Sequence, residues 1–252
     1  LKIFMPRKKE ENFSESVNSA LDFSLNKDPN MICYALGIND PKFTFGTTKN
    51  LKKKYGIRRI FDVPTSENAL TGIGVGAAIS GVRTVITHQR LDFSLLSFDQ
   101  IVNSAAKWRY MFGGKLKVPL TIRMIVGRGW GQGPTHSQNL SVLFCNIPGL
   151  KVVYPTFASD AKKLLIKSIF DPNPVIFFEH RWLHQLKDSD IMKRSSTKLK
   201  YSNLLTSGKD VTIISMSYLT LEAIKAKKML EKYNIKSDVI DLVSLKPLNY
   251  KP

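Results

Sequence analysis

Cysteine is scarce in this chain: its 252 residues contain two, Cys33 and Cys145. Two cysteines cannot form the disulfide framework of a small secreted domain, and their spacing matches no metal-binding motif. Residues 1–11 are partly basic but lack the apolar core of a secretory signal. We therefore expect a protein that is not secreted and that works in a reducing compartment, either the cytoplasm or the matrix of a mitochondrion or another organelle.

Long hydrophobic runs are also missing. The longest apolar stretch, residues 72–82, is interrupted by four glycines and is well short of the roughly 18 residues that a membrane span needs. Hydrophobic residues still make up 43% of the chain and charged residues 23%, which excludes a disordered chain and a fibrous repeat. At about 150 residues per domain, the length allows one large domain or two modest ones.

Acidic residues are the third shortage, with 20 Asp and Glu against 38 Lys and Arg, a formal net charge of +18. Such an excess of positive charge could bind nucleic acid, an anionic membrane surface or an acidic protein partner. The densest basic clusters, residues 7–9, 52–54 and 58–59, are short and separated by apolar residues. We therefore favour a solvated basic surface over a nucleic-acid groove.

Hydrophobic periodicity predicts alternating strands and helices through the first two thirds of the chain. Strands are expected at residues 31–36, 60–63, 85–87, 120–126, 152–154 and 175–178, and helices at residues 13–25, 51–55, 67–81, 98–111, 136–144 and 159–169. This rhythm predicts an α/β fold, with a mostly parallel sheet covered by helices on both faces.

A change in composition divides the chain. Residues 185–199 are polar with few apolar anchors, which is typical of a linker, and residues 211–242 then predict one more strand–helix–strand unit. Two strands and one helix leave one face of their sheet uncovered. We therefore predict a first domain over residues 1–184, a linker over residues 185–199 and an incomplete second α/β domain over residues 200–252.

A glycine-rich segment resembles a nucleotide motif. Gly72 to Ala77 matches G-x-G-x-x-A, and Asp92 lies twenty residues beyond Gly72. A dinucleotide fingerprint must directly follow a buried strand, whereas residues 64–70 have the composition of a turn and a helix start. We therefore predict that these glycines allow one helix to pack closely against another.

Two motifs could carry chemistry. Glu67 follows Ser66 at a predicted helix start, where a helix cap is the simplest interpretation. Glycines at positions 127, 129, 131 and 133 precede His136, and a loop of this kind at the carboxyl edge of a sheet is where ligands bind. His136 is therefore a candidate general acid or base, with a structural histidine as the alternative.

His180 and His184 have a spacing that could serve zinc, but the H-E-x-x-H arrangement is absent. We therefore predict an exposed or packed histidine pair at this position.

Several stretches in one order resemble a single family. They are FDVPTSE at 61–67, the glycine run at 72–81, DQIVNSAA at 99–106, YMFGG at 110–114, HSQ at 136–138, PGLKVV at 148–153, DAK at 160–162, DPNPV at 171–175 and DL…PL between 241 and 248. Together they resemble the beta subunit of the decarboxylating component of thiamine-diphosphate-dependent 2-oxo-acid dehydrogenases, pyruvate dehydrogenase type. The resemblance runs from about Phe13 to Pro247.

The resemblance implies a transketolase-like pyrimidine-binding domain followed by a transketolase C-terminal domain. It implies a beta subunit active only with an alpha subunit, which holds the diphosphate and Mg²⁺ through a G-D-G…N motif. No G-D-G occurs here. Such an enzyme decarboxylates a pyruvate-like 2-oxo acid and passes the acyl unit to a lipoyl group or another acceptor. The implied partners are the alpha subunit, a second beta subunit and an acyltransferase component.

The resemblance also implies roles for single residues. Glu67 matches the carboxylate that hydrogen-bonds the pyrimidine ring and so helps the cofactor to lose its thiazolium proton. Phe93 matches the aromatic residue that packs on the pyrimidine, and His136 the histidine that reaches the substrate. Some members of the family hold a structural potassium ion through backbone carbonyls. The matching positions are Leu120, Ser168, Ile169, Asp171 and Asn173.

Departures from the family keep the substrate open. Family members commonly read Glu-Phe-x-Thr-Phe-Asn-Phe where this chain reads THQRLDF at 87–93. Chargeable His88 and Arg90 near the cofactor predict an altered substrate pocket, for a less common 2-oxo acid or a carboligating reaction. A different class of function also stays open, namely a non-catalytic basic scaffold or nucleic-acid-binding module on the same fold. Glu67, Phe93 and His136 together favour the enzyme.

Overall fold

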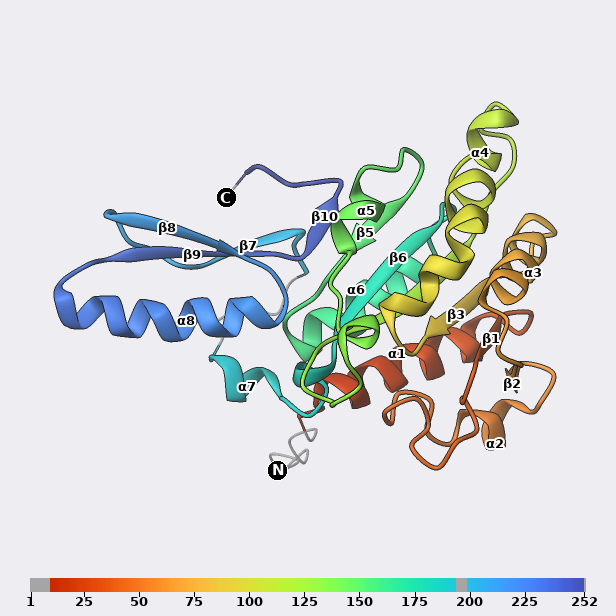
Figure 1. Cartoon of the computed structure of the whole chain (residues 1–252), viewed down its shortest axis with the longest axis horizontal. Coiled ribbons are helices and arrows are strands. Elements are labelled where there is room, and N and C mark those ends of the chain that lie inside the picture. Colours follow the sequence, from red (N-terminus) through yellow and green to blue (C-terminus); the bar gives the residue numbers. More distant parts are fainter. Residues whose placement is uncertain (1–9, 194–198, 252) are drawn as a thin grey trace, which may run out of the picture.

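A computed structural model describes residues 10–193 and 199–251 and contains two sheets (Figure 1). The larger has seven strands in the order β10-β5-β6-β4-β3-β1-β2, and the smaller has the order β7-β9-β8. The strands are β1 (Ile32–Ala35), β2 (Ile60–Asp62), β3 (Thr84–His88), β4 (Leu120–Val126), β5 (Lys151–Val153), β6 (Val175–His180), β7 (Ser202–Thr206), β8 (Val211–Ser215), β9 (Ser237–Leu242) and β10 (Ser244–Lys246). In the large sheet only β10 is antiparallel to its neighbour.

Helices cover both faces of the large sheet, which confirms the predicted fold class. The α-helices are α1 (Phe13–Lys27), α2 (Leu51–Tyr55), α3 (Glu67–Ile79), α4 (Trp108–Met111), α5 (Ser141–Cys145), α6 (Ala158–Ile169), α7 (Asp188–Ile191) and α8 (Tyr218–Leu230). Successive side chains along each strand of the large sheet point to opposite faces, and each face has its own hydrophobic core. Val85 and Phe177 face the core under α1 and α6, whereas Ile86 and Phe178 face the core under α3.

Helix α1 forms where the periodicity predicts a helix. The Asn12 side chain accepts a hydrogen bond from the Glu15 backbone (2.9 Å), and the Glu15 carboxylate accepts one from the Asn12 backbone (2.9 Å). This capping box satisfies amide groups that the first turn leaves unpaired. The apolar side of α1 then packs against α6.

Two predicted helices differ from the structure. Residues 98–111 do not form one α-helix, because a π-helical segment, η2 (Gln100–Ala105), separates η1 (Leu91–Ser97) from α4. The predicted helix at 136–144 is replaced by a 3₁₀ turn, η3 (Pro134–His136), and the short α5. The residues between them are held in place by Gln138, whose backbone and side chain both donate to Asp92.

The second sheet contains a strand that periodicity does not reveal. Strand β7 runs antiparallel to β9, and beyond β9 the strand β10 returns to the large sheet beside β5. Asp241, buried in β9, accepts hydrogen bonds from the hydroxyls of Thr156 (2.6 Å) and Thr220 (2.9 Å). Burial raises the pKa of Asp241 to about 6. These bonds tie β9 to the loop after β5 and to α8.

Some sequence predictions fall outside the described residues. Residues 194–198 of the predicted linker, the basic cluster at 7–9 and most of the segment inspected for a secretory signal are among them. Within residues 10–193 and 199–251, no helix is both long enough and apolar enough to cross a membrane.

Gly74 shows what the glycines of α3 allow. A Cβ atom at this position would lie 2.4 Å from Cδ1 of Ile86 in β3 and 2.7 Å from the hydroxyl oxygen of Tyr34 in β1. The close neighbour of Gly74 is therefore the sheet, and the prediction of a helix–helix approach is wrong at this position.

We expect Gly74→Ala to destabilise the chain by about 1–3 kcal/mol, because the added methyl overpacks a buried contact. Gly76→Ala is the matched control: the residue is exposed in the same helix, and its Cβ would meet nothing within 4 Å. The control should raise the free energy of unfolding by up to about 1 kcal/mol through helix propensity. Urea unfolding measures both, and equal effects would contradict the close approach.

Candidate functional site

Glu67 lies at the first turn of α3, just beyond the carboxyl end of β2. Its side chain is only 7% exposed, and it lines a small cavity together with Leu36, Leu70, Thr87, His88, Gln89 and Phe93. Ser66 makes no side-chain cap hydrogen bond. The carboxylate itself makes no hydrogen bond or ion pair with any described residue. Ser66 therefore does not cap α3, and the structural role left for Glu67 is the general preference of a helix N-terminus for a carboxylate.

Phe93 and His136 lie against each other. Their ring centroids are 5.3 Å apart with the ring planes at 89°, an edge-to-face contact. Because Phe93 also lines the Glu67 cavity, the structure brings two of the three candidates to one cavity and places His136 beside it.

The loop that carries His136 is fixed by hydrogen bonds from several directions. Trp130 Nε1 donates to the His136 carbonyl (2.6 Å), and the Asp92 carboxylate accepts from the Gln138 side chain (2.8 Å). The Arg90 guanidinium stacks on the Trp130 ring at 4.0 Å and donates to Gln132 (3.2 Å). The sequence indicates Asp92 only as part of a possible nucleotide motif, and its role in holding the loop was not predicted. The one local indication of that role is that Asp92 directly precedes the candidate Phe93.

His88 was predicted to be a chargeable residue near the cofactor, but the structure gives it a neutral side chain. Its ring is buried, and burial lowers the pKa of His88 to about 4. The imidazole is therefore neutral at pH 7. Its Nε2 atom lies 3.5 Å from the Thr71 hydroxyl, on the side of α3.

His180 and His184 are packed residues, which is one of the two alternatives that the sequence left open. His184 is fully buried against Phe13 (ring centroids 5.7 Å apart), and its Nε2 lies 3.2 Å from Glu179 Oε2. His180 stacks on Tyr218 at 4.9 Å. The described part of the chain holds no group of three or more His, Cys, Asp or Glu that could bind a metal, and both cysteines are free.

A buried ion pair lies beneath these loops. Arg123 in β4 and Glu179 in β6 are both 0% exposed and form two hydrogen bonds, of 2.5 and 3.0 Å. Burial alone would raise the pKa of Glu179, but Arg123 and His184 outweigh it and lower the pKa to about 2. The sequence signal was Arg123 within the mostly apolar run of residues 120–126 and Glu179 directly after the apolar run of residues 175–178.

The five potassium positions lie around the starts of β4 and β6. A hydrogen bond from Val118 N to Pro172 O (2.9 Å) joins the two segments. The Ile169 carbonyl already accepts a hydrogen bond from Arg83 (2.6 Å). The Asp171 carboxylate pairs with Lys151 (2.5 Å). Burial alone would raise the pKa of Asp171, but the hydrogen bonds from Lys151 and Asn173 outweigh it, and the pKa lies below its ordinary value.

Known proteins resemble the chain over most of its length. The family model for the transketolase pyrimidine-binding domain matches residues 9–185, and that for the transketolase C-terminal domain matches residues 200–251. The beta subunit of acetoin:2,6-dichlorophenolindophenol oxidoreductase from Cupriavidus necator is 38% identical, over 93% of this chain and 72% of its own length. Subunit beta-1 of the mitochondrial pyruvate dehydrogenase E1 component from Arabidopsis thaliana is 35% identical, over 96% and 68%.

Solved structures show the same fold. A split-gene transketolase described as an inactive beta4 tetramer superposes with a TM-score of 0.74 at 22% identity, covering 95% of this chain and 73% of that one. A Pichia stipitis transketolase complex superposes with a TM-score of 0.76 at 18% identity, covering 37% of that longer chain. The family matches and the two curated relatives together identify the chain as a member of the family of E1 beta subunits of the pyruvate and acetoin dehydrogenase type, built on a transketolase-like pyrimidine-binding domain.

Proposed function

We propose that the chain is the beta subunit of a heteromeric thiamine-diphosphate enzyme that decarboxylates a pyruvate-like 2-oxo acid and passes the acyl unit to a lipoyl group or another acceptor. The observation that carries this proposal is the buried Glu67 carboxylate, which has no partner among the described residues and shares a cavity with Phe93. The membership of the family supports it.

The residues present fit the pyrimidine half of this cofactor. Thiamine diphosphate, when bound, supplies a carbon nucleophile for attack on the 2-oxo carbon. The Glu67 carboxylate would hold a proton shared with the pyrimidine ring nitrogen, and the Phe93 ring would form an apolar wall beside it. His136, at the edge of Phe93, would face the substrate as a proton donor or acceptor.

Metal ions play different parts in the proposal. Mg²⁺ and the diphosphate would be held by the alpha subunit, since this chain has no G-D-G motif. For K⁺, the proposed ligands are the main-chain carbonyls of Leu120, Ser168, Ile169, Asp171 and Asn173. Two of these carbonyls already accept a hydrogen bond, Ile169 from Arg83 (2.6 Å) and Ser168 from the Asp171 backbone (3.2 Å), so each would have to share its oxygen with the ion. No catalytic step of the proposal uses the ion.

The proposed assembly has an alpha subunit, a second beta subunit and an acyltransferase component as partners. The proposed domain division stays at residues 1–184, 185–199 and 200–252. A reducing compartment, either cytoplasm or organellar matrix, suits the two free cysteines, and some relatives are named as mitochondrial. The alternative of a non-catalytic scaffold or nucleic-acid-binding module leaves Glu67 and its cavity unexplained.

We expect the isolated chain to bind thiamine diphosphate weakly or not at all, even with Mg²⁺, because it offers contacts to the pyrimidine alone. Titration calorimetry with the lone chain, and then with the alpha subunit added, measures this. Mg²⁺-dependent binding should appear only in the second experiment. Tight Mg²⁺-dependent binding by the lone chain would show that the half-site is assigned wrongly.

A further inference from the structure

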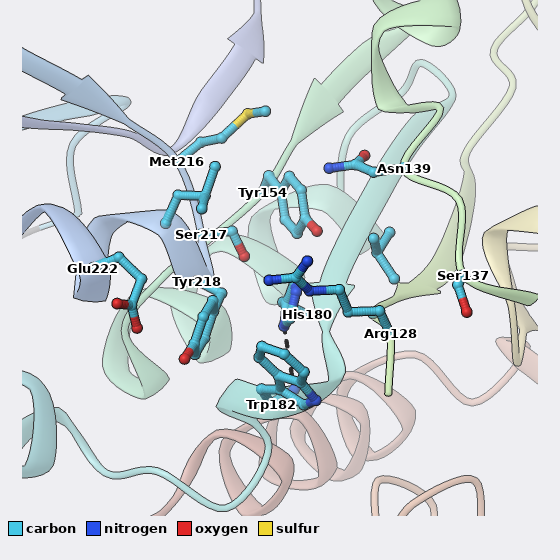
Figure 2. Close-up of a pocket in the computed structure, with 13 residues that line it drawn as sticks. Arg128, Ser137, Asn139, Tyr154, His180, Trp182, Met216, Ser217, Tyr218 and Glu222 are labelled. Carbon is cyan, nitrogen blue, oxygen red and sulfur yellow. Dashed lines mark hydrogen bonds between the residues drawn. The ribbon is translucent and has the colours of Figure 1, made fainter. Parts of the chain in front are cut away.

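A second, larger cavity of about 490 Å³ lies between the two sheets (Figure 2). It opens at the carboxyl ends of β4 and β6 and reaches the first turn of α8, and it shares no lining residue with the Glu67 cavity. Its lining includes Arg128, Tyr154, His180, Trp182, Ser217 and Tyr218. The carboxyl ends of parallel strands are the usual place for ligands in α/β folds.

Tyr154 is the first sign that a ligand belongs here. Its side chain is 1% exposed, and its hydroxyl has no hydrogen-bond partner among the described residues. The neighbouring Ser217 hydroxyl interacts electrostatically with the Tyr154 hydroxyl, but it donates its own hydrogen bond to the Pro155 carbonyl (3.4 Å). Figure 2 shows the Tyr154 hydroxyl pointing into the cavity, toward Arg128. A buried hydroxyl without a partner is costly, and a polar ligand in the cavity would supply one.

The N-terminus of α8 is a second, independent feature of the same cavity. Helix α8 has 13 residues, its N-cap Ser217 makes no side-chain cap hydrogen bond, and its first turn contains no acidic residue. Ser217 and Tyr218, at this helix end, both line the cavity. An uncapped helix N-terminus carries partial positive charge and favours an anion.

Two further donors converge on the cavity. Arg128 forms no ion pair within the described part of the chain, and its guanidinium lies 5.5 Å from the Trp182 ring centroid. His180 Nδ1 accepts a hydrogen bond from the Trp182 backbone (3.2 Å), so the proton of the neutral ring lies on Nε2. Burial, with smaller effects of His184 and Arg128, lowers the pKa of His180 to about 4, and the ring is therefore neutral at pH 7.

The acidic residue of the lining does not oppose an anion. Glu222 pairs with Lys225 at 2.9 Å, on the side of α8, and Figure 2 shows it at the edge of the group of labelled side chains. The donors that face the centre of the cavity are therefore a cation, a neutral imidazole and a hydroxyl.

We propose that this cavity binds a phosphate monoester. Its donors come from three separate elements, the ends of β4 and β6 and the loop after β5, and so would approach a ligand from different directions. That arrangement suits the three terminal oxygens of a tetrahedral phosphate better than the two oxygens of a planar carboxylate. The volume exceeds the need of a phosphate alone, and Trp182, Tyr218 and Met216 form a wall for the organic part.

The proposal goes beyond the decarboxylase function and does not depend on it, because none of its residues belongs to the Glu67 cavity. It is tested by titration calorimetry on the full chain alone, with inorganic phosphate and phenyl phosphate as probes. We expect saturable binding of both, with phenyl phosphate about tenfold tighter because its ring packs on the aromatic wall.

Two variants and one control assign the binding to this cavity. Arg128→Met should weaken phenyl phosphate binding by about 10- to 100-fold, the range for charge-assisted hydrogen bonds, and Tyr154→Phe by about 3- to 10-fold. Arg58→Met removes the same charge from an exposed residue of another segment and should change the affinity less than about twofold. Tyr154→Phe removes a hydroxyl without a partner, so its melting temperature should not fall.

Three results would show that no phosphate site exists in this cavity. They are the absence of saturable binding, equal losses in Arg128→Met and Arg58→Met, and full affinity in a folded Tyr154→Phe chain. Equal affinity for inorganic and phenyl phosphate would overturn the monoester assignment, since it would identify a site for free phosphate.

Discussion

Replacing Glu67 by glutamine is expected to abolish thiamine-dependent turnover in the heteromer reconstituted with its alpha subunit. Glutamine keeps the size and shape of the side chain but cannot hold the shared proton that the pyrimidine ring requires. Loss of a positioned acid–base group typically costs about 10²- to 10⁴-fold in rate. The Glu67 carboxylate has no partner among the described residues, so the substitution removes no ion pair. The free energy of unfolding should fall by no more than about 1 kcal/mol, the usual effect of a carboxylate at a helix N-terminus.

The control for this experiment is Glu231→Gln, which removes an equal charge from a half-exposed carboxylate paired with Lys227. That variant should turn over within about twofold of the wild type, because surface pairs contribute little. Steady-state kinetics and urea unfolding on both variants separate a catalytic from a structural role. Near-normal turnover by Glu67→Gln would refute the assignment, as would equal losses in the two variants.

Arg123→Met is expected to cause the largest loss of stability among single substitutions in the strands. It leaves the carboxylate of Glu179 buried at 0% exposure with only His184 beside it. Breaking a buried pair by removing one partner costs about 3–5 kcal/mol, because the remaining charge has lost its compensation. Urea unfolding at pH 7 measures the loss. Lys54→Met, which breaks an exposed pair with Asp22, should have a far smaller effect.

The pair also predicts a pH dependence. The native pKa of Glu179, about 2, lies below its ordinary value of 4.5. Its contribution to stability is therefore fully present above pH 4.5 and is lost as the pH falls toward 2. The double variant Arg123→Met/Glu179→Gln should lose this dependence and should be more stable at pH 7 than Arg123→Met alone. A double variant that is less stable than the single one would contradict a coupled pair.

Local pattern alone predicted six of the seven strands of the large sheet and most of its helices. The bounds of α2 at residues 51–55 and of β4 at residues 120–126 agree with the prediction, because an apolar run or a helical period lies within a few neighbouring residues. The alternation of strands and helices was enough to predict a mostly parallel sheet. The family motifs likewise placed Glu67, Phe93 and His136 as candidates before any contact between them was known.

Tertiary structure decided what depends on residues far apart in the sequence. Strand β7 has two leucines among polar residues and β10 has three residues, and pairing with β9 and β5 makes them strands. Arg123 meets Glu179 across 56 positions, and Gly74 is required by a methyl group of β3. The phosphate cavity draws its donors from three elements that only the fold brings together. Such contacts have no local signature, because periodicity records which face of an element is buried but not which partner buries it.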